Sequence, residues 1–291
     1  MRLSVVIPVH SKAARLRLTL AGLLGQIDSG DSQLILSADR PTAEVRAALT
    51  DVPEAIVVEP SRGGRAAARN AGAARADGDV LIFVDDDILV RADFLQCHRR
   101  AQAEQPGLVH GALREMIGLL RVEDPAAGGP GCPPIDAARL RSGDWDPGCA
   151  RLVTNPLEQA AEHADAAARW PWLACAGANI SVPRAAWASI GGFDEGYGTS
   201  WGMEDIDFAY RLWKSGVPIS LAPSARGYHM SHYSPSRWDE HRGNLARFQA
   251  RANCPEALAL SALLSPRGSL ERYRECVHHI RQHGSAPSPQ A

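Results

Sequence analysis

The sequence predicts an α/β fold in which a mainly parallel central sheet is flanked by helices. Apolar, β-branched runs of strand length alternate with runs of helix length through residues 1–115, and parallel strands require such crossover helices. The most apolar run, residues 80–84, ends directly in Asp85, Asp86 and Asp87. Open α/β sheets bind ligands beyond the carboxyl ends of their strands, so these carboxylates mark the first candidate site.

Each element of the first half has a local signature. Residues 3–9 (LSVVIPV) form an apolar, β-branched run and predict the first strand. Ser11 is expected to cap the next helix, whose leucines recur at helical spacing between residues 16 and 24. Further strands are predicted at residues 33–38, 55–59, 80–84 and 108–113, with helices from Thr42, over 66–76 and over 91–104.

The second half is less regular. Residues 124–148 are rich in Gly and Pro, which favours an irregular loop or lid over a domain linker. The last residues, 284–291, have the composition of a disordered tail. Between them the pattern predicts helices over residues 157–169, 183–188, 204–212, 238–252, 255–264 and 267–282, and strands over 174–182 and 217–222.

Composition narrows the class of protein. The chain has 291 residues, of which 45% are hydrophobic and 22% charged, as in ordinary soluble domains. A net charge of -2 gives no general attraction to nucleic acid. The six cysteines show no C-x-x-C spacing, which favours reduced thiols, although Cys132 and Cys149 could pair under oxidation.

The sequence also bears on location. It shows no signal-peptide pattern and no uncharged apolar stretch long enough to cross a bilayer. We therefore expect a soluble, cytoplasmic protein without a transmembrane segment, in which any membrane contact is peripheral.

The three carboxylates have two possible uses. Adjacent carboxylates repel one another, which favours a cation or several hydrogen-bond donors nearby. One or two of them could instead cap the predicted helix over residues 91–104. The run by itself leaves both interpretations open.

Two other motifs have similar alternatives. The turn at residues 61–65 (SRGGR) favours an anion, because its glycines allow close backbone approach and a helix with Arg65 and Arg69 begins there. Arginines on an Ala-rich helix also form ordinary solvated faces. Glu204 and Asp205 open a helix, where acids are favoured by the helix dipole alone.

Together these segments resemble the GT-A glycosyltransferases of the large inverting family 2. The matching pieces are SVVIPVH, RGGRAAARNAGAARADGDVLIFVDDD, AGANISVPRAAWASIGGFDEGYG and WGMEDIDFAYRLWKSG. The last piece also looks like enzymes that transfer galactose or N-acetylhexosamine. The resemblance implies a GT-A domain over residues 1–232, with a nucleotide-binding half (1–115) and an acceptor and catalytic half (150–232), and a helical extension over 233–283.

The resemblance implies a metal site built on a D-x-D motif. Asp87 would bind Mn²⁺ or Mg²⁺, which bridges the donor diphosphate and stabilises the departing nucleoside diphosphate. Asp85 would lie nearer the ribose, and Asp86 belongs to the same nucleotide-binding group without a separate task. A downstream histidine usually completes the site. His229 is preferred here over His232, and an imidazole ligand favours Mn²⁺.

The resemblance also implies the catalytic and acceptor residues. Asp205 matches the general base, which removes the acceptor proton while oxygen attacks the anomeric carbon opposite the diphosphate. Glu204 is expected to bind sugar hydroxyls of the acceptor or donor. Trp201 could offer an aromatic face to an acceptor sugar, although buried packing is the commoner use of tryptophan.

Donor contacts are implied at several positions, and one departs from the family pattern. The family usually has Asp-Asp-Gly-Ser after its second strand, whereas this chain has Ser-Ala-Asp-Arg-Pro. Asp39 is at best a displaced substitute for the aspartate that contacts uracil in the family. The resemblance therefore leaves open the choice of UDP over another nucleotide. The remaining implied nucleotide and donor residues are Pro8, Arg62, Arg69, Asn70, Gly177 and Asn179.

The predicted function is metal-dependent, inverting transfer of a hexose or N-acetylhexosamine from a nucleotide sugar, with UDP favoured, to an acceptor hydroxyl. A retaining transferase and a catalytically silent carbohydrate-binding protein on the same fold stay open. A nucleotidyltransferase would be expected to carry a Gly-rich loop where this chain has PVHS at residues 8–11. The acceptor site is expected to be shaped by residues 124–148, residues 170–172 and the C-terminal helices. The sequence does not indicate whether the acceptor is a sugar-bearing or a small molecule, and it does not indicate the oligomeric state.

Overall fold

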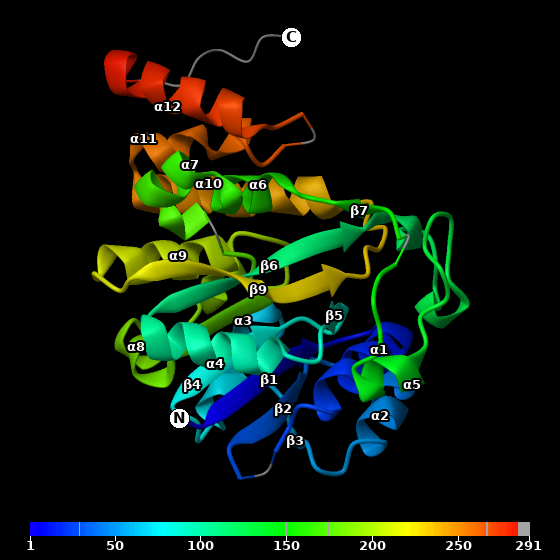
Figure 1. Cartoon of the computed structure of the whole chain (residues 1–291). Helices are drawn as coiled ribbons and strands as arrows, with labels where there is room; N and C mark the ends of the chain where they lie inside the picture. Colours follow the sequence, from blue (N-terminus) through cyan, green and yellow to red (C-terminus); the bar gives the residue numbers. More distant parts are fainter. Residues whose placement is uncertain (29, 149, 174, 266, 285–291) are drawn as a thin grey trace.

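The computed structural model describes residues 1–28, 30–148, 150–173, 175–265 and 267–284 (Figure 1). The strands form one nine-stranded sheet with helices on both faces. None of the helices in these residues is long and apolar enough to cross a membrane. The predicted tail falls outside the described residues, apart from Gly284, which follows the last helix as its C-cap.

The first half is the predicted strand–helix alternation. Strand β1 lies between β2 and β4 and pairs with both in parallel, and β2 pairs in parallel with β3. Alternate residues of β1 face opposite cores, because Val6 packs toward α3 whereas Val5 and Ile7 pack toward α1 and α2. The bounds are β1 (Leu3–Val9), α1 (Ala13–Leu24), β2 (Ser32–Ala38), α2 (Ala43–Thr50), β3 (Ile56–Val58), α3 (Arg65–Ala74) and β4 (Val80–Val84).

Helix starts were predicted less well than strands. The α1 N-cap is Lys12 and has no side-chain cap, so the expectation for Ser11 is wrong. Thr42 does cap α2, since its hydroxyl accepts a hydrogen bond from the Val45 backbone N–H. Strand β5 (Ile88–Val90) was not predicted, and it separates residues 85–87 from α4 (Phe94–Glu104).

The presence of β5 decides one open question. Asp93 occupies the N-cap position of α4, and none of the three preceding carboxylates reaches that helix end. The helix-cap interpretation of residues 85–87 is therefore wrong.

The second half turns the sheet into a mixed one. β8 pairs antiparallel with β4 and β6, β6 pairs in parallel with β9, and β9 pairs antiparallel with β5. The short β7 pairs with β6. The bounds are β6 (Leu108–Met116), η1 (Ile117–Leu119), η2 (Pro125–Ala127), α5 (Ala137–Ser142), β7 (Leu152–Val153), α6 (Pro156–Glu162), α7 (Ala164–Arg169), η3 (Pro171–Leu173), β8 (Asn179–Pro183), α8 (Arg184–Ser189), η4 (Glu195–Tyr197), α9 (Glu204–Lys214) and β9 (Ile219–His229).

Several predicted bounds in this half need correction. The helix predicted over residues 157–169 is two helices that meet at His163. The strand predicted from residue 174 begins only at Asn179, and Ala174 itself lies outside the described residues. The strand predicted to end at residue 222 continues to His229. Residues 124–148, predicted as an irregular loop or lid, contain only η2 and α5 as regular elements among the described residues, and Ile135, Leu140 and Trp145 are buried in a core shared with α1.

The C-terminal helices share a core with residues 160–212. They are α10 (Arg237–Ala252), α11 (Pro255–Leu258), η5 (Ala259–Ala262) and α12 (Leu270–His283), and Figure 1 shows them together at one end of the molecule. Trp172, fully buried, packs against Tyr210 of α9 and Phe248 of α10 with ring centroids 5.2 and 5.9 Å away. Trp172 is therefore a core residue, not an acceptor contact.

Candidate functional site

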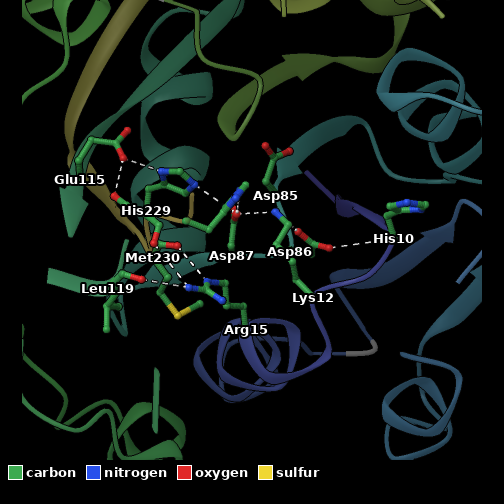
Figure 2. Close-up of polar contacts among 12 residues, drawn as sticks. His10, Lys12, Arg15, Asp85, Asp86, Asp87, Glu115, Leu119, His229 and Met230 are labelled. Atoms are coloured by element: carbon green, nitrogen blue, oxygen red, sulfur yellow. Dashed lines mark hydrogen bonds and ion pairs between the residues drawn. The ribbon is translucent and has the colours of Figure 1, made fainter. Parts of the chain in front are cut away.

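Acidic and basic side chains meet at the carboxyl ends of the parallel strands, as predicted. Figure 2 shows residues 85–87, which follow β4, beside His10 and Lys12, which follow β1. The far end of β9 brings His229 to the same place. The pairing of β9 with β5 and β6 is responsible, because it sets His229 opposite Ile88 and Glu115.

Asp87 is the centre of this group. Its side chain is buried, and its Oδ2 lies 3.2 Å from His229 Nε2 and 3.4 Å from His232 Nε2. One ligand atom from each of the three residues falls within 4.8 Å of the others. A carboxylate with two imidazoles can hold a divalent transition metal, and the two nitrogen ligands disfavour Mg²⁺, which prefers oxygen. The residues thus fit a divalent cation, and both the preferred His229 and the less preferred His232 lie beside Asp87.

Lys12 occupies part of the same space. Its Nζ lies 2.5 Å from Asp87 Oδ2 and 3.0 Å from Asp86 Oδ1. Burial alone would lower the pKa of Lys12, but the two aspartates outweigh burial and raise it. A cation bound at Asp87 Oδ2 would therefore have to displace this ammonium group. The role of Lys12 was not predicted, because its position after β1 has no distinctive local pattern.

Glu115 supports the imidazole of His229 from behind. Its Oε2 lies 2.6 Å from His229 Nδ1 and accepts a hydrogen bond from Ser231 Oγ at 2.8 Å. Burial would lower the pKa of His229, but Asp87 and Glu115 outweigh burial and raise it to about 10. Such a carboxylate–histidine pair fixes the ring with its other nitrogen toward the metal position. Glu115 was missed because the predicted strand ended at residue 113.

Arg69 joins the two acidic parts of the site. Its guanidinium is buried and donates to Asp85 Oδ1 and Glu204 Oε1, each at 2.8 Å. Burial would lower the pKa of Arg69, but Asp85 and Glu204 raise it. The predicted nucleotide contact is thus an internal bridge between the end of β4 and the start of α9.

Asp205 lies beside this bridge. Its carboxylate accepts hydrogen bonds from the backbone N–H groups of Gly177 at 3.0 Å and Ile206 at 2.8 Å. Burial and the neighbouring Glu204 raise the pKa of Asp205 to about 6. At Gly177, an added Cβ would lie 2.9 Å from the Arg69 guanidinium and 3.1 Å from the Asp205 Cβ, so the absence of a side chain is what lets the three residues meet.

The structure does not bring the side chains of Asn70 and Asn179 to the site. Asn70 exchanges hydrogen bonds of 2.8 and 2.9 Å with the backbone of Phe193 and so holds the turn before α9. Asn179 is fully buried and bonds to His98 Nε2 at 2.9 Å and to the Ala225 carbonyl at 2.8 Å. Both amides are committed to internal partners, which argues against the donor contacts expected of them.

The other expected nucleotide residues line the edge formed by β1, β2 and α3. Asp39 follows β2, and its Oδ2 accepts a hydrogen bond from the Gly64 backbone N–H at 2.7 Å. Gly64 has φ +113°, and an added Cβ would lie 2.0 Å from the Gly198 carbonyl oxygen, so this turn requires glycine. Pro8 lies within β1, and Arg62 is exposed on the turn.

Trp201 lies against the C-terminal extension. The Arg237 guanidinium stacks 4.7 Å from its ring centroid, and Trp238 approaches it edge-on with centroids 6.4 Å apart. The Trp201 backbone N–H donates to Glu240 at 2.9 Å. Helix α10 thus covers the turn that leads to Glu204 and leaves Trp238 38% exposed beside it.

Comparisons with known proteins identify two adjacent families in the chain. Residues 4–115 match the model for glycosyl transferase family 2, and residues 158–233 match the model described as the N-terminal domain of galactosyltransferase. Validoxylamine A glucosyltransferase of Streptomyces hygroscopicus subsp. jinggangensis (strain 5008) is 31% identical over 245 residues, which are 79% of this chain and 56% of that protein. The chain thus spans about half the length of that relative. Uncharacterized glycosyltransferase YfnE of Bacillus subtilis (strain 168) is 25% identical over 275 residues, covering 84% of this chain and 69% of YfnE.

Solved structures agree on the fold. TarS 1-349 of S. aureus superposes with a TM-score of 0.58 at 14% identity, covering 98% of this chain and 74% of that one. GalNAc-T7, solved with UDP, GalNAc and Mn²⁺, gives a TM-score of 0.57 at 15% identity, covering 98% and 56%. The predicted GT-A fold, with its mainly parallel central sheet, is confirmed.

Proposed function

We propose that this chain, which has a GT-A fold and matches glycosyl transferase family 2 over residues 4–115, is a glycosyltransferase. It transfers a hexose or N-acetylhexosamine from a UDP-sugar to an acceptor hydroxyl with inversion, aided by Mn²⁺ or Mg²⁺. In this proposal residues 1–232 are the transferase unit, with the nucleotide in the half at 1–115 and the acceptor in the half at 150–232. The extension at 233–283 completes the acceptor side through Trp201 and α10.

The observation that carries the proposal is the Arg69 bridge. It places the D-x-D residue Asp85 and the acidic pair of Glu204 and Asp205 around one buried guanidinium. A donor that spans this bridge would have its diphosphate toward Asp87 and its sugar toward Asp205. GalNAc-T7, which shares the fold, was solved with UDP and Mn²⁺, and this agrees with the proposed choice of nucleotide and metal.

The chemistry follows from the separate environments of the acids. Asp87, His229 and His232 would hold the cation, which when bound supplies positive charge to the departing diphosphate. Asp205 takes the acceptor proton as the acceptor oxygen attacks, and its two backbone hydrogen bonds fix the carboxylate for that step. Glu204, held by Arg69, positions sugar hydroxyls. Asp39 and the Gly64 turn lie where they can contact the nucleoside.

The test is a panel of nucleotide sugars in which slow donor hydrolysis is measured with Mn²⁺ and with EDTA. We expect one UDP-sugar to be consumed fastest and only with the metal, because water can replace the acceptor. The anomeric configuration of the first product, read by NMR, distinguishes inversion from retention. No consumption of any donor would favour a catalytically silent protein on this fold.

Ligand-dependent stability gives an independent prediction. UDP with Mn²⁺ should raise the melting temperature by several degrees, because a ligand at about 100 times its Kd adds about 2.7 kcal/mol to the free energy of unfolding. UDP with EDTA should shift it much less. Equal shifts in differential scanning fluorimetry with and without Mn²⁺ would contradict a metal-bridged nucleotide.

The rate should also depend on pH through Asp205. The base must be ionised, and its pKa is raised to about 6, so kcat should fall about tenfold per pH unit below pH 6 and level off above it. Initial rates between pH 5 and 8, at saturating Mn²⁺ and donor, give the profile. Mn²⁺ must be saturating because His229 has to lose a proton before it can bind the metal, and a pH-dependent metal affinity would otherwise add to the profile of Asp205. A flat profile would argue against Asp205 as the base.

A further inference from the structure

Arg15 is a buried cation outside the groups that would touch substrate. It lies near the start of α1, its residue is 6% exposed, and Figure 2 shows its guanidinium pointing toward Met230 and Leu119. Its Nε donates to the Met230 carbonyl at 3.1 Å. Its terminal nitrogens donate to the carbonyls of Leu119, Val122, Glu123 and Ser231 at 3.3, 2.7, 3.3 and 3.5 Å.

These partners are unusual for a buried guanidinium. All five of its hydrogen bonds to described residues go to backbone carbonyls, and none goes to a carboxylate. Burial lowers the pKa of Arg15, although Asp87 and Asp86 lie close enough to oppose that shift. The planar, five-donor fork suits several carbonyls at once, which the single ammonium group of lysine cannot reproduce.

The carbonyls belong to two segments with different neighbours. Met230 and Ser231 lie between the two histidines of the candidate metal site, and residues 119–123 lead into the Gly- and Pro-rich stretch. The segment of residues 229–232 is also held to the aspartate run at residues 85–87, because the Met230 backbone N–H donates to the Asp87 backbone carbonyl at 2.9 Å. Arg15 thus closes the opposite side of the loop that presents both imidazoles.

We propose that Arg15 is a positioning residue for the metal site. Its guanidinium fixes the path of residues 229–232 so that both imidazoles face Asp87, and it joins that path to residues 119–123. The proposal rests on the proposed function only in taking Asp87, His229 and His232 as the cation ligands.

The direction in which Mn²⁺ affinity changes distinguishes a positioning role of Arg15 from a purely electrostatic one. Removing a positive charge near a cation site should by itself tighten Mn²⁺ binding. Loss of positioning should weaken it, by about tenfold or more for a partner of the ligands. We therefore expect both Arg15→Met and Arg15→Lys, made in the full chain, to weaken Mn²⁺ binding by at least about tenfold when free Mn²⁺ is followed by EPR.

Arg17→Met is the matched control. Arg17 lies on the same helix, its side chain is 49% exposed, and its ion pair with Asp51 is 3.7 Å long. Its loss should leave Mn²⁺ affinity unchanged. Unchanged or tighter Mn²⁺ binding in Arg15→Met would overturn the proposal.

Hydrogen exchange of the full chain tests the same idea without metal. In Arg15→Met, the amides of residues 229–232 and 119–123 should exchange at least about tenfold faster, while those of β1 and β4 keep their wild-type rates. Faster exchange throughout would indicate a general role in stability and overturn the proposal. If the wild-type protein binds no Mn²⁺, the metal part of the proposed function fails, and unchanged exchange in these two segments would then reject the inference separately.

Discussion

Asp205→Asn is expected to reduce donor hydrolysis by about 10²- to 10⁴-fold, the usual contribution of a positioned general base. Asparagine keeps the size of the side chain and can still accept the hydrogen bond from the Gly177 backbone N–H. It has no basicity, so the acceptor or water would keep its proton as the anomeric bond forms. Hydrolysis of the UDP-sugar that the wild-type protein consumes fastest gives the rate.

The variant must keep its binding site for this result to count. Stabilisation by UDP and Mn²⁺ should remain close to that of the wild type, because the proposed donor orientation sets Asp205 beside the sugar and not beside the diphosphate. Asp239→Asn is a suitable control, since that carboxylate lies on α10 with its side chain 72% exposed. If Asp205→Asn retained more than about a tenth of the rate, another group would have to be the base.

Asp87→Asn is expected to weaken Mn²⁺ binding by two orders of magnitude or more and to abolish the metal-dependent part of UDP binding. The reason is geometric and electrostatic, because Asp87 Oδ2 is the oxygen that both imidazoles approach. An amide oxygen lacks the charge that holds a hard cation. EPR of free Mn²⁺ and calorimetry of UDP with and without Mn²⁺ would measure the two losses.

The change also removes one of the two carboxylates that pair with Lys12, so stability has to be measured alongside affinity. Melting in EDTA shows whether the variant folds, and Asp93→Asn, which lies at the exposed start of α4, controls for loss of a nearby carboxylate. Wild-type Mn²⁺ affinity in a folded Asp87→Asn protein would place the cation elsewhere.

The strand predicted over residues 217–222 ends immediately before Pro223, and a proline cannot donate to a sheet hydrogen bond. In the structure β9 continues past Pro223, and its register with β6 shifts between Gly111 and Leu113, so that the extra residues around Pro223 are absorbed there. That irregularity sets His229 opposite Glu115.

Asn179 and Lys12 illustrate errors of the opposite kinds. Asn179 falls inside a matching motif and was expected at the donor, yet it is fully buried between β6, β9 and α4. Lys12 was not predicted as a site residue, and its Nζ lies 2.5 Å from Asp87 Oδ2. A motif indicates which segment reaches a site, but not which way each side chain in it points.

The sequence by itself determined the α/β class, the strand that presents residues 85–87 and the segments that carry Asp205 and His229, because periodicity and motif order are local properties of a chain. Only the tertiary structure decided that both histidines face Asp87, that Glu115 and Arg15 support them, and that Arg69 joins the two acidic groups. Those contacts join residues up to 216 positions apart. They depend on strand register and burial, which no short window of sequence specifies.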